Sequence, residues 1–248
     1  MNLQISAPYQ PCVYHCPFCV ARGHKHEYKF DNLYGTDEKL YFSRLHNFLI
    51  DYSLKTDVLP TVIITGECDP SQNMKWATRV ANECSDLGCK VEFQTHNLSL
   101  KESDIPRAID VLSYSITSVR EYLSAWRYVK PDWCINRMVM ILRDGFEFLN
   151  KDNFSPMGFD QITFKALNHG ESDNINNWID EHTPASIDNF YEIMESRNGS
   201  TLSVRVDTTC QQAEGRYFVF RSDGNIYDSW EAVNPKSAKM KNIEIEMY

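Results

Sequence analysis

Short apolar runs alternate with segments of helical periodicity along most of this chain, and this alternation limits the folds that it can adopt. The runs rich in β-branched and aromatic residues predict buried strands, at 2–6, 62–64, 90–95, 109–117, 135–142 and 161–167. Segments with apolar residues at helical spacing lie between and after them, at 37–52, 73–87, 119–128, 173–181 and 187–197. Strands that alternate with helices pair in parallel through right-handed crossovers. The sequence therefore predicts an α/β fold, either a barrel or a doubly wound sheet.

Composition and charge exclude several classes of protein. A chain of 248 residues with 42% apolar residues can bury a large core. Its 34 acidic residues outnumber the 25 Lys and Arg, and the resulting net charge of -9 disfavours non-specific binding to nucleic acid or to an anionic membrane. The segment 1–9 lacks the pattern of a signal peptide, and no apolar run approaches the roughly 20 residues that span a bilayer. We expect a cytoplasmic protein that does not enter a membrane.

Three of the eight cysteines, Cys12, Cys16 and Cys19, stand within eight residues, and His24 and His26 follow them. In a chain without a signal peptide, such crowding favours metal binding over disulfide formation. Three thiolates can hold three irons of a [4Fe-4S] cluster and leave the fourth iron open. Alternatively, a histidine completes a tetrahedral zinc site. The number of ligands leaves both readings open.

The spacing of these three cysteines, C-x3-C-x2-C with the aromatic Phe18 before the last one, resembles the signature of the radical S-adenosylmethionine (radical SAM) superfamily. The resemblance covers roughly the first two hundred residues, because Gly66-Glu67 follows the second strand, where the family has a Gly-Glu pair. It implies a partial (β/α)6 barrel, a [4Fe-4S] cluster on Cys12, Cys16 and Cys19, and SAM on the open iron. Glu67 would then accept hydrogen bonds from the methionine ammonium, and Gly66 would let the backbone approach closely.

Three further residues match the family more loosely. Asn97, in Thr95-His96-Asn97, lies where the family often has a Thr-Asn-Gly-like turn. Ser115 lies on the fourth strand, where small polar residues of the family contact the ribose or the methionine carboxylate. Arg137, on the fifth strand, is a candidate partner of the same carboxylate.

The last part of the chain changes character. Strands are predicted at 201–206 and within 216–230, with Ser222–Asn225 as a hairpin turn. We therefore expect a core barrel at 1–200 and a small C-terminal β appendage at 201–248, which would cover the open end of the barrel. This segment is similar to the hairpin of SPASM and twitch extensions in the superfamily. Because Cys210 is its one cysteine, we expect no auxiliary cluster.

The resemblance predicts an oxygen-sensitive enzyme that takes electrons from an external donor of the flavodoxin or ferredoxin type. It would cleave SAM reductively to a 5'-deoxyadenosyl radical that abstracts hydrogen from a substrate. We expect a small-molecule, nucleotide or modified-nucleoside substrate. The alternatives are modification of a ribosomally made peptide and, in a different class, a non-catalytic zinc-binding module.

Overall fold

The computed structural model describes residues 2–7, 12–19, 37–167, 169, 173–184, 186–208, 217–228 and 230. In this part of the chain the strands form a nine-stranded sheet in the order β7-β6-β5-β4-β3-β2-β1-β8-β9. The strands are β1 (Asn2–Ala7), β2 (Thr61–Gly66), β3 (Val91–Thr95), β4 (Val111–Ile116), β5 (Ile135–Leu142), β6 (Gln161–Ala166), β7 (Ser203–Asp207), β8 (Tyr217–Phe220) and β9 (Ile226–Tyr227). The α-helices are α2 (Glu38–Thr56), α3 (Met74–Asp86), α4 (Val119–Ser124), α5 (Asp173–His182) and α6 (Asp188–Ser196).

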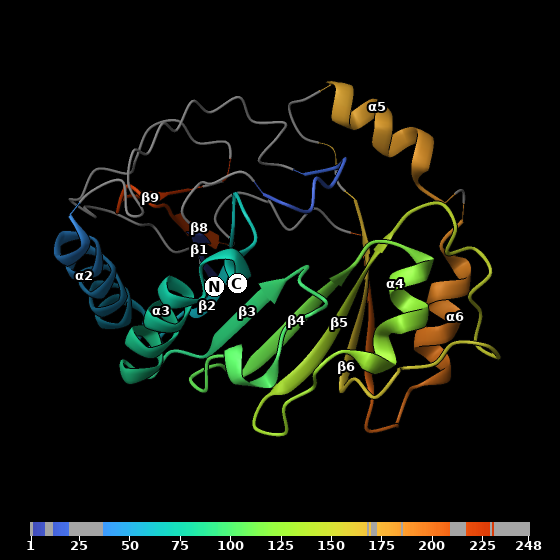
Figure 1. Ribbon diagram of the computed structural model, residues 1–248, viewed down its shortest axis with the longest axis horizontal. Coiled ribbons are helices and arrows are strands. Elements are labelled where there is room, and N and C mark those ends of the chain that lie inside the picture. Colours follow the sequence, from blue (N-terminus) through green and yellow to red (C-terminus); the bar gives the residue numbers. More distant parts are fainter. Residues whose placement is uncertain are drawn as a thin grey trace.

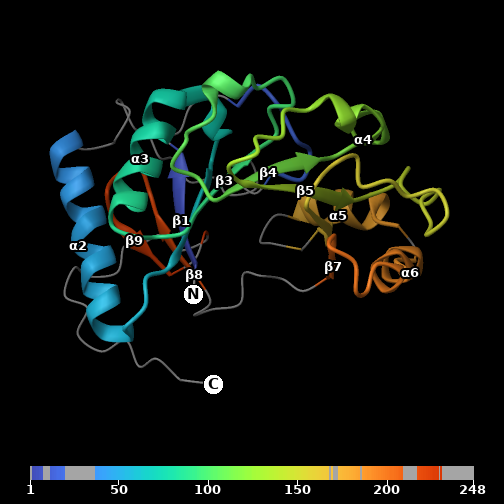
Figure 2. The same cartoon turned by 90° about the horizontal axis from the view of Figure 1, so that it is seen from below.

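Every neighbouring pair of strands in this sheet is parallel except β8 and β9, which form an antiparallel hairpin. Figure 2 shows that the sheet is curved, with the β8–β9 hairpin at one end and β7 at the other turned towards the same side. The predicted α/β class and the partial barrel with a small C-terminal hairpin are both confirmed.

The main apolar core lies between the outer face of the sheet and the helices α2, α3, α4 and α6 (Figure 1). Alternate strand residues supply it, because successive side chains on a strand point to opposite faces. On β4, for example, Leu112, Tyr114 and Ile116 are fully buried in this core, whereas Ser113 and Ser115 point the other way. On β4 the inner, concave face of the sheet therefore carries these two serines.

The long helices begin where the sequence predicts. The side chain of Asp37 accepts a hydrogen bond from Leu40 N at the start of α2, and that of Asn73 accepts one from Trp76 N in α3. The expected helix 119–128 is shorter than predicted, because α4 ends at Ser124 and a 3-10 turn follows. The Ser124 hydroxyl donates to the carbonyl of Arg120 at 2.8 Å, a bond that competes with regular helix geometry.

The C-terminal strands join the same sheet. β7 pairs in parallel with β6, and β8 pairs in parallel with β1, where Ile5 lies opposite Phe220. The predicted turn is confirmed: Arg221 N donates to Asn225 O at 3.1 Å, and Gly224 has a φ of 74°. The hairpin thus extends the edge of the sheet next to β1. The division into two units at residue 200 stays a prediction, and Cys210 lies outside the described residues.

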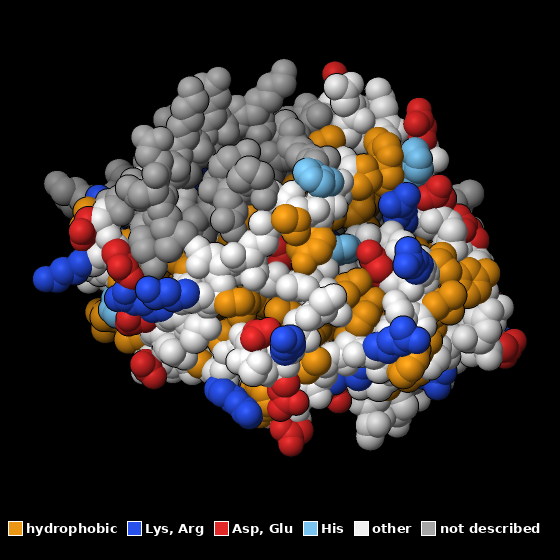
Figure 3. Space-filling model, viewed as in Figure 1, with side chains coloured by type: hydrophobic (Ala, Val, Ile, Leu, Met, Phe, Trp, Pro, Cys, Tyr) orange, Lys and Arg blue, Asp and Glu red, His pale blue; other side chains and the backbone are white. Residues whose placement is uncertain are grey.

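None of the helices in the described ranges is long and apolar enough to cross a membrane. On the face seen in Figure 3, Lys and Arg side chains are scattered among acidic ones and do not gather into a basic patch.

Candidate functional site

A cavity of about 310 Å³ opens at the carboxyl ends of the parallel strands. In open parallel sheets this edge is where ligands generally bind. The residues that line the cavity come from the cysteine loop (Cys12–Cys19) and from the ends of β2 to β6. They include Cys12, Cys16, Cys19, Thr65, Gly66, Glu67, Asp69, Gln94, His96, Ser115, Thr117, Ile141 and Lys165. The structure thus brings together all three predicted cluster cysteines, the Gly-Glu pair and Ser115.

The cysteine loop is a set of thiols crowded at one wall of this cavity. Burial, followed by the charges of Cys19 and Cys12, raises the pKa of the Cys16 thiol to about 11. Such a group holds several thiolates only when a cation compensates their charge. Among the described residues no three His, Cys, Asp or Glu side chains already stand in metal-binding geometry. The donor set itself, three thiols on one short loop with room beside them, fits an iron-sulfur cluster with an open position.

Gly66 has to be glycine for a reason that the sequence does not reveal. Its φ is 147°, and a Cβ at this position would stand 2.3 Å from the backbone nitrogen of Ala7 on β1. The close approach is therefore to the neighbouring strand just before the cysteine loop. Any side chain here would push apart the two strand ends that carry the loop and Glu67.

Glu67 is the next residue, and its carboxyl group faces an environment that disfavours charge. Burial raises the pKa of Glu67 to about 7, the charge of Arg221 lowers it, and the charge of Asp223 raises it further. Both charged partners belong to the turn of the C-terminal hairpin. The hairpin therefore acts on the electrostatics of the cavity from the edge of the sheet.

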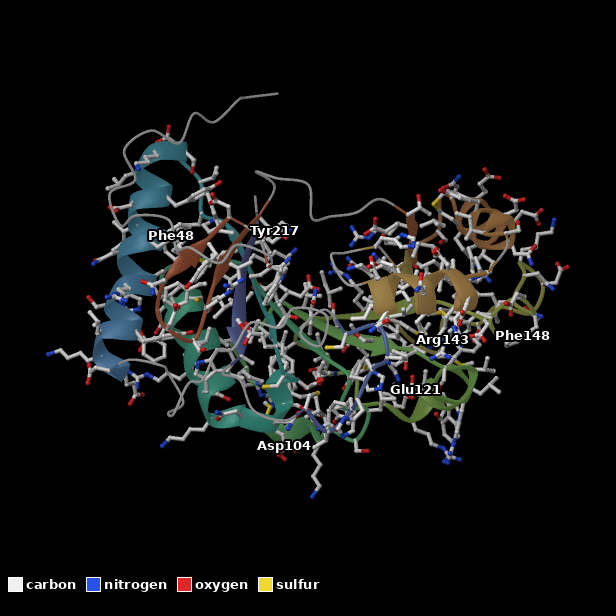
Figure 4. The ribbon with its side chains drawn as sticks, turned by 90° about the horizontal axis from the view of Figure 1, so that it is seen from above. Phe48, Asp104, Glu121, Arg143, Phe148 and Tyr217 are labelled. Atoms are coloured by element: carbon white, nitrogen blue, oxygen red, sulfur yellow. The ribbon has the colours of Figure 1, made fainter. Side chains whose placement is uncertain are left out.

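A polar network that no sequence motif predicts forms the wall next to the cysteine loop. Asp69 accepts hydrogen bonds from Thr95 Oγ1 at 2.8 Å and from His96 N at 2.5 Å. The His96 ring lies 3.2 Å from a Glu121 carboxylate oxygen, and it meets Tyr14 of the cysteine loop edge to face at 4.8 Å. In Figure 4 the labelled Glu121 marks the α4 side of the site. The network links the cysteine loop to three separate segments of the barrel.

One signal for this network is present in the sequence. Ser118-x-x-Glu121 is the pattern of a helix-capping box, and Ser118 does accept a hydrogen bond from Glu121 N. In the structure, however, the Glu121 carboxylate accepts a hydrogen bond from Thr117 N at 2.6 Å and also contacts the His96 ring. Burial raises the pKa of Glu121, but these contacts outweigh it, and the pKa is lowered. Its contact with His96 depends on tertiary structure.

Two predicted site residues do not line the cavity. Arg137 lies near the start of β5, and its guanidinium contacts Glu92 at 2.6 Å and Gln161 at 2.9 Å. Asn97 lies in a turn, where its side-chain oxygen accepts from Ser99 N at 3.1 Å. The structure therefore places neither side chain among the residues that line the cavity. His24 and His26 lie outside the described residues.

No protein-family model and no curated protein matches the chain. Solved structures of SuiB from Streptococcus suis do. The structure of SuiB bound to its precursor peptide SuiA has 13% sequence identity to this chain and a TM-score of 0.55. The match covers 95% of this chain and 61% of the SuiB chain. The complex with S-adenosylmethionine has 14% identity and a TM-score of 0.52, with 95% and 60% coverage.

This chain thus spans about three fifths of the length of SuiB. At this level of identity the likeness concerns the fold. The chain has the same fold as SuiB, and this fold is the partial α/β barrel that we expected.

Proposed function

We propose that this chain is a radical SAM enzyme that modifies a peptide. The observation that carries the proposal is one cavity, at the carboxyl ends of a SuiB-like barrel, lined by Cys12, Cys16 and Cys19 together with Glu67. SuiB was solved both with S-adenosylmethionine and with a precursor peptide, which supports the peptide alternative over the small-molecule or nucleotide substrate that we expected.

Each group of the site has a separate task in this proposal. The three cysteines hold the [4Fe-4S] cluster, and Glu67, Gly66 and Ser115 bind SAM beside it. Bound and reduced, the cluster would supply one electron for the cleavage of SAM into methionine and a 5'-deoxyadenosyl radical that abstracts hydrogen from the substrate. The walls of the cavity orient the substrate and exclude water.

Glu67 orients the methionine half of SAM. Its ionised carboxylate accepts hydrogen bonds from the SAM ammonium, a charge-assisted contact that offsets the burial of both groups. Glu67→Ala should therefore weaken SAM binding while leaving the cluster in place.

Anaerobic reconstitution tests the class of protein. The reconstituted chain should bind about four irons and form 5'-deoxyadenosine from SAM and dithionite. Cys16→Ala should lose both properties. Cys134→Ala should keep them, because this thiol directly precedes the first residue of β5 and does not line the cavity. About one zinc per chain without SAM cleavage would establish the zinc-binding module instead.

Isotope transfer tests the substrate class. The enzyme is incubated with SAM and a fully deuterated peptide digest, and in parallel with a deuterated nucleotide pool. Because the radical takes its hydrogen from the substrate, deuterium in 5'-deoxyadenosine should come from the peptides. Transfer from the nucleotide pool alone would contradict the peptide assignment.

A further inference from the structure

The concave face of the sheet carries two cations on the neighbouring strands β6 and β7. Lys165 is the fifth residue of β6 and lines the cavity. Arg205 lies on the same face of β7, because it is the register partner of Thr163 and its Nε donates to Thr163 Oγ1 at 3.0 Å. Thr163 and Lys165 are two residues apart, so both point to the concave side.

Neither cation is neutralised within the described part of the chain. The ion pairs found there include neither the Lys165 ammonium nor the Arg205 guanidinium. The acidic register partner of Lys165 is Asp207, which has other interactions of its own. By contrast, Arg137 on the same face is paired with Glu92 at 2.6 Å. Within the described ranges, Lys165 and Arg205 thus lack the carboxylate partner that Arg137 has.

Lys165 lies across the sheet from Glu67. Glu67 follows β2, whereas Lys165 comes from β6, with β3, β4 and β5 between them. The cysteine loop starts after β1 and reaches α5, where Phe18 meets Trp178 at 5.8 Å. Ile141 lies beside Lys165 in register on β5 and also lines the cavity, so the ammonium has an apolar neighbour that strengthens its interaction with an anion. A ligand anion at Lys165 would leave the Glu67 side free for SAM.

We propose that Lys165, assisted by Arg205, binds a carboxylate of the substrate and so selects peptides with an acidic side chain near the modified residue. This inference rests on the proposed function for the identity of the substrate as a peptide. The net charge of the chain is -9, so acidic peptides would not be held by its overall field. Their recognition requires a local site of this kind.

Matched peptide libraries test the site. Fluorescent random 12-residue peptides with one fixed Glu are compared with the same library carrying Gln, by anisotropy with the reconstituted, SAM-loaded protein. The wild type should bind the Glu library about tenfold or more tightly, as expected for a charge-assisted hydrogen bond. Lys165→Gln should abolish this preference, Arg205→Gln should reduce it, and Lys165→Arg should retain it.

Controls keep the result specific and separate it from the proposed function. Lys75→Gln, which removes an exposed lysine from α3 outside the cavity, should leave the preference unchanged. Equal binding of the two libraries by the wild type, or a preference that survives in Lys165→Gln, would overturn the inference. So would Lys165-dependent binding of ATP without any preference for Glu peptides. Formation of 5'-deoxyadenosine by the wild type is measured separately, so failure of the proposed function would show there.

Discussion

Glu67 combines two demands that conflict in the absence of a ligand. Its carboxylate has to be charged to accept hydrogen bonds from an ammonium group, yet burial raises its pKa to about 7. Because this value lies above the ordinary value near 4.3, the folded state favours the neutral form. Ionisation above pH 7 therefore destabilises the ligand-free fold, and the penalty vanishes at pH values below the unfolded pKa.

Glu67→Gln should consequently stabilise the ligand-free protein at alkaline pH. We expect the free energy of unfolding at pH 8.5 to rise by an amount on the order of 2–3 kcal/mol, with the gain fading as the pH falls towards 4. Urea denaturation of the variant and the wild type across this pH range measures the difference. A difference that does not change with pH would contradict the assignment.

Arg137 should behave as a structural residue. Its partner Glu92 has a side chain only 7% exposed, so Arg137→Met would leave a buried carboxylate without its cation. The expected loss of stability is about 3–5 kcal/mol. Adding Glu92→Gln should recover part of it, because the double variant buries no unpaired charge.

The same variant separates this role from the one that the family resemblance suggests. SAM binding, measured by equilibrium dialysis at a temperature where Arg137→Met is folded, should stay within about twofold of the wild type. A loss of SAM affinity of tenfold or more, with stability unchanged, would restore Arg137 as a partner of the methionine carboxylate.

At the scale of elements, local patterns in the sequence predict most strands and helices but not how distant segments pair. The β5 prediction, 135–142, coincides with the observed strand because its flanks and its apolar period are both clear. The strands after residue 200 pair with strands of the barrel, β7 with β6 and β8 with β1. Segments such as 217–220 carry no local signal for a partner more than two hundred residues away.

β8 should be as important to stability as the strands of the barrel. Phe220 is fully buried and meets the ring of Tyr41 on α2 edge to face at 4.8 Å. Phe220→Ala should lower the free energy of unfolding by about 3–5 kcal/mol in a single cooperative transition. Phe148 is 45% exposed and lies at the opposite end of the molecule from Phe48 in Figure 4. As a control, Phe148→Ala should change the free energy of unfolding by less than about 1 kcal/mol.

An independent C-terminal unit would instead unfold in a separate, earlier transition. If residues after 200 formed an independent unit, Phe220→Ala would shift only that transition and leave the unfolding of the barrel unchanged. Near-ultraviolet circular dichroism and tryptophan fluorescence, followed together during denaturation, distinguish the two cases.

At the scale of the whole molecule, the candidate site was predictable where a motif is contiguous. The cysteines and Gly66-Glu67 are short patterns at strand ends, and they meet in one cavity because parallel strands end at a common edge. Asp69, His96 and Lys165 belong to no such pattern, and their place at the cavity depends on register across several strands. Arg137 lies on the expected strand, but near its amino end, which keeps it away from the mouth.

The alternation along the strands gives this barrel two independent sets of positions. From β4 to β6, even-numbered residues build the core beneath the helices, and odd-numbered residues face the concave side. A mutation that changes what the protein recognises need not disturb what keeps it folded. A library randomised only at Ser115, Ile141 and Lys165, the odd positions of these strands that line the cavity, should therefore retain folded members at high frequency, whereas one that includes Arg137 should not.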